Sequence, residues 1–195
     1  NPGNFSFRGS LRSKIYVDKS ELIAKTNEAL CTEQRYICVS RPRRFGKSMA
    51  ANMLAAYYDR SENTEELFRN LAISKDSSYK ENLNQYDVIK INMQEFLSMS
   101  GTMEEMLEML KKYLVLDFEE TYPQVRFRDE KNLIQVMKDV FSYTRCPFVI
   151  LIDEWDCLFR EYQQDQEAQK KYLDFLRAWL KDKDYVALAY MTGIL

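Results

Sequence analysis

The chain has 195 residues, of which 28 are basic and 30 are acidic, so its formal net charge is -2. This balance excludes a global attraction for nucleic acid or anionic membranes, although a local basic patch could still bind them. The chain contains no histidine, which excludes Ser-His-Asp and Cys-His catalysis and leaves carboxylates, lysine and bound metal as catalytic groups. Because 46% of the residues are hydrophobic, the length is sufficient for one domain with a substantial core.

The sequence shows neither a membrane span nor an export signal. No apolar run approaches the roughly 20 residues that a membrane helix needs, and the start, Asn1-Pro2-Gly3-Asn4, does not resemble a signal peptide. We therefore expect a cytoplasmic protein with no membrane partner. The cysteines form no Cys-x-x-Cys pair, which favours reduced, packed thiols over a zinc site. They are Cys31, Cys38, Cys146 and Cys157.

The first third of the chain predicts a helix and then a strand. Residues 1–14 contain glycines, serines and basic residues without periodicity, which predicts an irregular lead-in. Asp18 and Ser20 are N-cap residue types, so we expect a short helix from there to about Leu30. Residues 35–40 are rich in β-forming residues and predict a strand that ends at a proline-containing loop.

Helical spacing begins again at Lys47, where Met49, Met53 and Tyr57 share one face. The following residues, 60–87, are polar and predict little regular structure beyond one short amphipathic piece. This long connection is the least predictable part of the chain.

The second half alternates strands and helices. A strand is predicted over 88–93, and Thr102 with Glu105 forms a capping box ahead of an amphipathic helix. Another helix is centred on 133–141. The unbroken apolar run at 148–152 is typical of a strand that is covered on both faces in a parallel sheet.

The chain ends with a helix that carries Tyr172 and Trp179 and a strand over 186–191. The alternation of strands and helices predicts an α/β fold, a doubly wound parallel sheet with helices on both faces and right-handed crossovers.

The loop after the first strand is the first candidate site, and it reads Ser40-Arg41-Pro42-Arg43-Arg44-Phe45-Gly46-Lys47-Ser48. Phosphate-binding loops place backbone N–H groups and a helix N-terminus against the anion, while a lysine reaches the phosphates and a hydroxyl binds Mg²⁺. The tripeptide Gly46-Lys47-Ser48 matches the end of the pattern G-x-x-x-x-G-K-[ST], but Arg41 stands at the first glycine. Alone, the tripeptide is better explained as the start of an ordinary helix behind an exposed basic turn. The predicted phosphate-binding residues are Arg43, Arg44, Phe45, Gly46, Lys47 and Ser48.

Two carboxylates after the apolar strand favour the phosphate-loop interpretation over an ordinary helix start. Asp153 and Glu154 follow residues 148–152, and ligands of open α/β sheets bind at the carboxyl edge of the strands. We expect Asp153 to hold Mg²⁺ together with Ser48, and Glu154 to orient and deprotonate an attacking water. The alternative is a solvated turn. The two motifs occur in the expected order, each at the end of its own strand, which favours the catalytic interpretation.

Together these motifs resemble the bacterial and archaeal AAA-ATPase-like proteins, P-loop NTPases that are often joined to a C-terminal PD-(D/E)XK nuclease-like region. The similar segments are Tyr16 to Ser20, Arg41 to Ser48, Ile150 to Asp156 and Thr192 to Leu195. In that family the Arg-Pro-Arg-Arg-Phe-Gly-Lys-Ser form is the ordinary phosphate loop. Trp155 stands where tyrosine is expected, which leaves the carboxylates untouched. The resemblance implies an ATPase that uses ATP and Mg²⁺, and it does not imply a client.

Several further positions keep two interpretations. Thr192 follows the last strand, where related ATPases place a catalytic sensor of the γ-phosphate, but it could simply close the strand. Arg43 and Arg44 could stabilise transition-state charge or only raise the local positive potential. Asp156 could support the metal, or it could serve in a turn or as a helix cap.

Tyr16 and Asp18 precede the first strand, where related ATPases often contact the base of the nucleotide. Packing and helix capping explain these two residues equally well.

The expected function is therefore Mg²⁺-dependent ATP hydrolysis. One alternative is a nucleotide-binding switch that needs an arginine from a second copy or a partner protein. Another is an interaction module that binds nucleic acid or protein through its basic loop. We expect residues 15–195 to form a P-loop domain that is truncated at its C-terminus, with a further strand beside residues 35–40, helical lid elements and any nuclease-like, nucleic-acid-binding region beyond Leu195.

Overall fold

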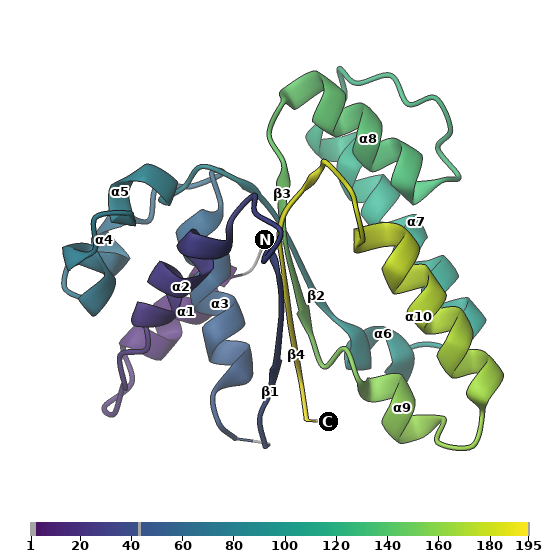
Figure 1. Cartoon of the computed structure of the whole chain (residues 1–195), viewed down its shortest axis with the longest axis horizontal. Helices are drawn as coiled ribbons and strands as arrows, with labels where there is room; N and C mark the ends of the chain where they lie inside the picture. The colour runs from purple at the N-terminus through teal and green to yellow at the C-terminus, as the bar shows by residue number, and fades with distance from the viewer. Residues whose placement is uncertain (1–2, 43, 195) are drawn as a thin grey trace. The chain divides into compact units, whose positions relative to one another are not determined.

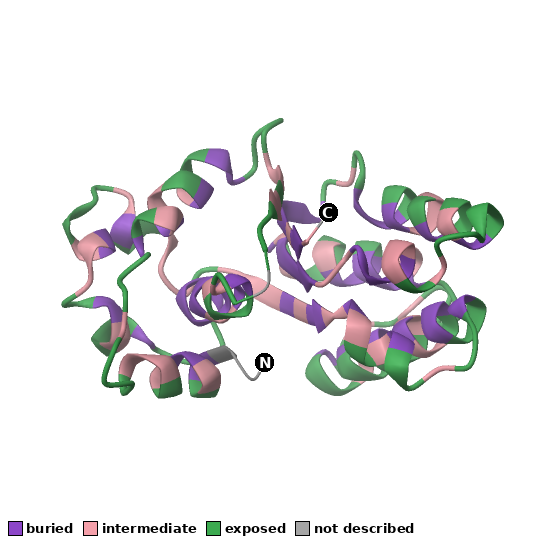
Figure 2. Ribbon diagram, turned by 90° about the horizontal axis from the view of Figure 1, so that it is seen from below, coloured by how far each residue is buried: buried purple, intermediate pink, exposed green. Residues whose placement is uncertain are grey.

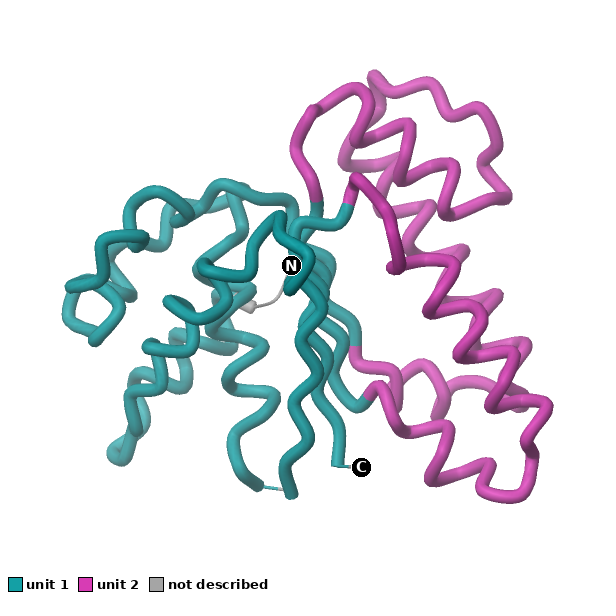
Figure 3. Tube along the Cα trace, in the orientation of Figure 1, with its two compact units in different colours: residues 1–91, 148–154, 186–195 teal, residues 92–147, 155–185 magenta. Residues whose placement is uncertain are grey.

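The computed structural model describes residues 3–42 and 44–194 (Figure 1). The described chain divides into two compact units (Figure 3). Unit 1 comprises residues 1–91, 148–154 and 186–195, and unit 2 comprises residues 92–147 and 155–185.

A four-stranded, all-parallel sheet is the centre of the α/β fold, and helices flank it. The strand order is β1-β4-β3-β2, so the chain crosses over between neighbouring strands as predicted. The strands are β1 (Tyr36–Ser40), β2 (Asp87–Asn92), β3 (Phe148–Asp153) and β4 (Val186–Gly193). Because β1 lies at one edge, the predicted further strand would have room beside it, and that strand stays a prediction.

The register of the sheet places the ends of three strands together. Ser40 of β1 pairs with Gly193 of β4, and Asp153 of β3 pairs with Thr192 of β4. Parallel strands have their carboxyl ends at one edge, so the loop after β1 and the residues after β3 leave the sheet at the same place.

Burial explains why the apolar run forms strand β3. All six of its residues are buried, as are all but one of the residues of the neighbouring strand β4, and Figure 2 shows buried residues within the sheet. Val149 and Leu151 pack in the core of unit 1 with Leu188 and Tyr190 of β4. Phe148, on the other face by alternation, is also buried. The prediction of a strand covered on both faces is confirmed.

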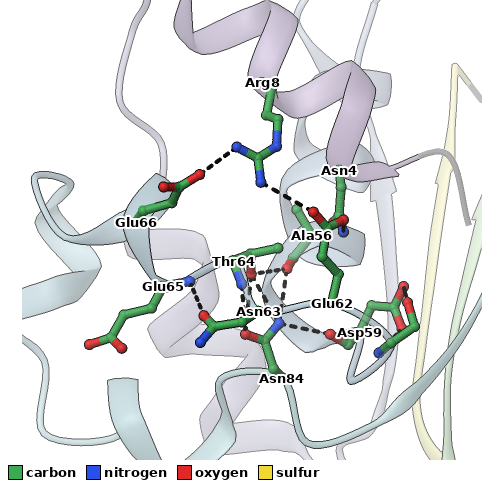
Figure 4. Close-up of polar contacts among 11 residues, drawn as sticks. Asn4, Arg8, Ala56, Asp59, Glu62, Asn63, Thr64, Glu65, Glu66 and Asn84 are labelled. Carbon is green, nitrogen blue, oxygen red and sulfur yellow. Dashed lines mark hydrogen bonds and ion pairs between the residues drawn. The ribbon is translucent and has the colours of Figure 1, made fainter.

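Unit 1 contains the two helices that were predicted beside β1, one short helix in the predicted amphipathic piece, α4, and two short helical segments that were not predicted. They are α2 (Glu21–Ala29), α3 (Lys47–Tyr58), α4 (Glu65–Phe68), the 3₁₀ helix η1 (Ala72–Lys75) and α5 (Tyr79–Asn82). The polar connection is ordered by side-chain bonds to the backbone rather than by apolar periodicity. The Asn84 amide, for example, donates to the Asp59 carbonyl at 2.7 Å and to the Thr64 hydroxyl at 2.9 Å (Figure 4).

The irregular lead-in predicted for residues 1–14 is wrong, because Gly3–Leu11 form helix α1. Its anchor is Phe7, which is fully buried and stacks on Phe68 with ring centroids 5.2 Å apart. Arg8 adds ion pairs to Glu66 at 2.5 Å and to Glu62 at 3.3 Å (Figure 4). Phe7 and Leu11 pack against the core, and Asn4 and Arg8 both contact Glu62, so tertiary contacts hold this helix.

The regular secondary structure of unit 2 is helical, apart from the last residue of β2. Its helices are α6 (Met93–Ser98), α7 (Met103–Thr121), α8 (Leu133–Thr144), α9 (Cys157–Glu161) and α10 (Gln166–Leu180). Half of the capping box predicted for α7 forms. The Thr102 hydroxyl accepts from the Glu105 amide at 3.2 Å, whereas the Glu105 carboxylate accepts from the Gly101 amide at 2.8 Å instead of from the Thr102 amide. Helices α6 and α9 were not predicted.

The thiols are packed in only two of the four cysteines. Cys146 and Cys157 are buried as expected, whereas Cys31 and Cys38 are exposed. Over the described part of the chain, none of the helices combines the length and the apolar character that crossing a membrane requires.

Candidate functional site

The loop between β1 and α3 has an unusual backbone. Gly46 stands at the N-cap of α3 with φ +77°, and Arg44 has φ +68°. Glycine adopts this left-handed region without steric cost, whereas a residue with a Cβ is strained there. Arg43, between them and β1, lies outside the described residues. The strained arginine shows that the surrounding structure holds the loop in this form.

Lys47 is enclosed by the loop that precedes it. Only 8% of this residue is exposed, and its ammonium group donates to the carbonyl of Arg41 at 2.8 Å and of Pro42 at 3.1 Å. The loop therefore wraps around the lysine, whose charge adds to the positive end of the α3 dipole. The result is a concentration of positive charge and helix N–H groups, the arrangement that binds anions.

Asp153 joins three elements of unit 1. Its side chain is buried at the end of β3. One carboxylate oxygen accepts a hydrogen bond from the Ser48 hydroxyl of α3. The other oxygen accepts from the Thr192 hydroxyl of β4 and from the Glu154 amide at 3.1 Å. The structure thus brings together Ser48, Asp153 and Thr192, which the sequence predicted as separate parts of one site.

Glu154 follows Asp153 with φ +54°, again in the left-handed region. Its backbone N–H donates a hydrogen bond to the Asp153 carboxylate at 3.1 Å. A strained residue directly after a buried carboxylate is typical of a functional site, because the surrounding contacts must offset the strain. The residue is partly exposed at the carboxyl edge of the sheet.

The remaining loop residues face solvent. Arg41 and Arg44 are exposed, and 60% of Phe45 is accessible. The charge of the exposed Arg44 is therefore available to the loop, which suits either of the two roles that the sequence allowed this residue.

Tyr16 is partly buried and packs against the core of unit 1. Its ring meets Phe7 edge to face at 6.4 Å. Burial, followed by the charge of Asp18, raises the pKa of Tyr16 to about 12. These contacts support the packing interpretation of this tyrosine.

Asp18 and Ser20 do not cap helix α2 with their side chains. Ser20 occupies the N-cap position, but its hydroxyl makes no capping bond and accepts from the Ile73 amide at 3.1 Å. Asp18 accepts from the Ala72 amide at 2.7 Å and from the Ser20 amide at 2.8 Å. The capping prediction is therefore wrong, because both side chains accept hydrogen bonds from backbone amides of η1.

Asp156 belongs to unit 2. It is fully buried and forms an ion pair with Arg160 at 3.6 Å. It stands at the N-cap position of α9 without a side-chain capping bond, so the capping alternative is not supported.

Lys19 had no predicted role in the site, although its ammonium group donates to the Phe45 carbonyl at 3.1 Å. The two residues are 26 positions apart. No spacing rule predicts this contact, since it depends on where the segment before α2 folds back.

The donors at this site fit a magnesium ion. The Ser48 hydroxyl and the Asp153 carboxylate offer oxygen atoms, which Mg²⁺ prefers. The described residues contain no cluster of three His, Cys, Asp or Glu side chains that could hold a metal alone. Such a set suits Mg²⁺, which keeps several waters and binds phosphate oxygens beside one or two protein ligands.

The parallel α/β sheet, with a lysine and a helix N-terminus after β1 and a carboxylate at the end of β3, has the fold of the P-loop class. A family model described as "Predicted AAA-ATPase" matches residues 7–195. The chain therefore belongs to this AAA-ATPase-like family, and membership implies that it binds a nucleotide. Neither the curated proteins nor the solved structures gave a match to the chain.

Proposed function

We propose that the protein binds ATP with Mg²⁺ and hydrolyses it to ADP and phosphate. The observation that carries this proposal is the hydrogen bond between the Ser48 hydroxyl and the Asp153 carboxylate, at the end of the loop that encloses Lys47. A hydroxyl and a carboxylate held side by side next to an anion-binding loop provide for a metal and a phosphate together.

Lys47 and the backbone amides at the start of α3 bind the phosphates in this proposal. Lys47 exchanges its contacts with the Arg41 and Pro42 carbonyls for phosphate oxygens. Arg44, with Arg43, adds positive potential around the phosphates. Phe45 contributes backbone groups to the same loop.

Ser48 and Asp153 would hold Mg²⁺, which when bound neutralises charge on the phosphates. Thr192 fixes the orientation of the Asp153 carboxylate through its hydroxyl. This bond gives Thr192 a role in the site whether or not it also senses the γ-phosphate. The serine, threonine and aspartate come from three elements, so the site is assembled only when unit 1 is folded.

Glu154 is the proposed general base. Its carboxylate accepts a proton from a water molecule as the water oxygen bonds to the γ-phosphorus. The bond from that phosphorus to the bridging oxygen breaks, and ADP leaves with the electron pair. The left-handed backbone at Glu154 supports a special placement of this side chain.

The test is thermal unfolding with ATP or ADP, in the presence of Mg²⁺ or of a chelator, together with phosphate release. Ligand at 100 times its dissociation constant should stabilise the protein by about 2.7 kcal/mol. Lys47→Ala should lose most of this stabilisation, and Lys25→Ala, on the exposed surface of α2, should keep it.

Three results distinguish the alternatives. Stabilisation with phosphate release supports the proposal. Stabilisation without release, restored by a second copy or a partner that supplies an arginine, identifies a switch. Tight nucleic-acid binding that ignores ATP and is lost on Arg44→Ala identifies an interaction module and overturns the proposal.

A further inference from the structure

The ammonium group of Lys19 lies against the tip of the phosphate loop. It donates to the Phe45 carbonyl at 3.1 Å. A Cβ added at Gly46 would meet the same nitrogen at 3.3 Å, before any other atom outside the adjacent residues. Lys19 therefore contacts the peptide unit that joins Phe45 to Gly46, at the point where the loop becomes helix α3.

The backbone of Lys19 is held on both sides. Asp18 accepts from the Ala72 amide at 2.7 Å, and Ser20 accepts from the Ile73 amide at 3.1 Å. The carbonyl of Lys19 accepts from the Leu22 amide at 3.0 Å. The segment Asp18-Lys19-Ser20 is thus a strap, tied to η1 by its outer residues and to the phosphate loop by its central lysine.

The two hydrogen bonds that Asp18 accepts are formed at neutral pH. Burial would raise the pKa of Asp18, but hydrogen bonds from Ala72 and Ser20 outweigh burial and leave the pKa below its ordinary value. Asp18 is therefore a carboxylate under the conditions in which a nucleotide would bind, and it accepts both amide bonds fully.

The orientation of one peptide group links this strap to the phosphates. In a trans peptide the C=O and N–H bonds point in opposite directions. A cation that holds the Phe45 carbonyl therefore fixes the Gly46 N–H on the opposite side of the peptide, away from Lys19. The loop needs a fixed orientation of this amide, because backbone N–H groups are its phosphate ligands.

We propose that Lys19 is a positioning residue of the phosphate loop, which fixes the Phe45–Gly46 peptide so that the Gly46 amide faces the nucleotide phosphates. This inference rests on the proposed function for its ligand. It adds a residue that touches the loop and not the nucleotide, and it gives the Asp18-Lys19-Ser20 segment a role in nucleotide affinity.

Lys19→Met and Lys19→Arg test the proposal, with Lys25→Met as the matched control. Lys25 lies on α2, where its side chain is 73% exposed and forms an ion pair with Glu28 at 3.3 Å. The first measurement is hydrogen exchange of the backbone amides of residues 41–48 without nucleotide. The second is the dissociation constant of Mg²⁺-ATP, and the third is the thermal midpoint.

We expect Lys19→Met to speed exchange in residues 41–48 and to weaken Mg²⁺-ATP binding about 3- to 10-fold, the worth of one hydrogen bond. Lys19→Arg should restore both properties, because it keeps the charged donor. The thermal midpoint should stay close to that of Lys25→Met, since the contact is exposed. A purely structural role would lower the midpoint and would not spare the arginine variant.

The exchange measurement separates the two proposals. If the wild type fails to bind Mg²⁺-ATP, the proposed function is wrong, but faster loop exchange in Lys19→Met alone would still support the positioning role. If Lys19→Met and Lys25→Met give the same loop exchange and the same affinity, the role of Lys19 is overturned while the proposed function stands.

Discussion

Ser48 and Asp153 are 105 positions apart, and the hydroxyl of Ser48 donates a hydrogen bond to the carboxylate of Asp153. This bond connects the first turn of α3 to the end of β3. Because the carboxylate is buried, it depends on its three hydrogen-bond donors for the solvation that water would otherwise give it. Removing any one of these donors should therefore disturb the Asp153 carboxylate at the proposed metal site.

The first prediction is that Ser48→Ala weakens ATP binding mainly when Mg²⁺ is present. The variant removes a metal ligand and leaves one Asp153 oxygen without its present donor. We expect affinity in Mg²⁺ to fall roughly 10- to 100-fold, the effect typical of a changed metal environment, and affinity in a chelator to change little. Titrations under both conditions measure this, with Ser98→Ala on the exposed side of α6 as control. An equal loss with and without Mg²⁺ would place Ser48 outside the metal site.

The second prediction concerns Gly46→Ala. At φ +77° an L-residue is strained by about 1–2 kcal/mol, and the new methyl group would press on the Lys19 ammonium. Because Lys19 is flexible, the backbone strain should dominate, and Mg²⁺-ATP affinity should fall roughly 5- to 30-fold. Gly9→Ala is the matched control, since nothing lies within 4 Å of its Cβ position in α1. An unchanged affinity in Gly46→Ala would show that binding does not require this loop conformation.

The elements that were predicted from the sequence have a repeating apolar pattern. Helix α8 presents a regular buried face that includes Val136, Met137 and Val140, and β3 is apolar from Phe148 to Ile152. The elements that were missed are short or depend on single anchors. Helix α1 is held by Phe7 against Phe68, and no window of its own sequence contains that partner.

The candidate site divides in the same way. Lys47, Ser48 and Asp153 could be predicted because each lies in a local motif whose chemistry requires that residue type. The hydrogen bond from Thr192 to Asp153 follows from the sheet register, which places these two residues opposite each other. Lys19 could not be given a role, since its contact with Phe45 depends on the tertiary path of the strap.

The third prediction tests an ion pair of unit 2. Asp139 is 7% exposed and accepts from the Arg128 side chain at 2.7 Å, from the Arg128 amide at 2.8 Å and from Gln135 at 2.9 Å. Asp139→Asn replaces one carboxylate oxygen, which accepts a hydrogen bond, by an NH₂ group, which cannot accept one. We expect it to lower the free energy of unfolding at pH 7 by about 1.5–3 kcal/mol, measured by urea denaturation.

This loss should depend on pH in a defined direction. Burial acts to raise the pKa of Asp139, but the bonds from Arg128 and Gln135 outweigh it, so the pKa is lowered on folding. A lowered pKa stabilises the fold above the unfolded value of about 3.9, and the stabilisation is lost as pH falls through the folded value. The difference between wild type and Asp139→Asn should therefore shrink in acid. Asp117→Asn, on the exposed side of α7, is the control. A difference that persists in acid would assign the effect to packing rather than to charge.

The last prediction is that Glu154→Gln separates binding from turnover. Glutamine keeps the size of the side chain but cannot take a proton from water. Binding of Mg²⁺-ATP should therefore persist, since Lys47, Ser48 and Asp153 are intact. Phosphate release should fall roughly 10²- to 10⁴-fold, the usual contribution of a positioned general base, which corresponds to about 2.7–5.5 kcal/mol of barrier. The measurements are the dissociation constant of Mg²⁺-ATP and the steady-state rate of phosphate release.

Glu120→Gln on α7 makes the same chemical change at an exposed position and should leave both quantities unaltered. Because Glu154 occupies a left-handed backbone position, a thermal midpoint for Glu154→Gln equal to that of the wild type would show that the strain is retained and that only the basic group is lost. If the wild type hydrolyses ATP and Glu154→Gln does so at the same rate, Glu154 is not the base. A variant that binds ATP less tightly in proportion to its slower turnover would instead place Glu154 among the groups that hold the nucleotide.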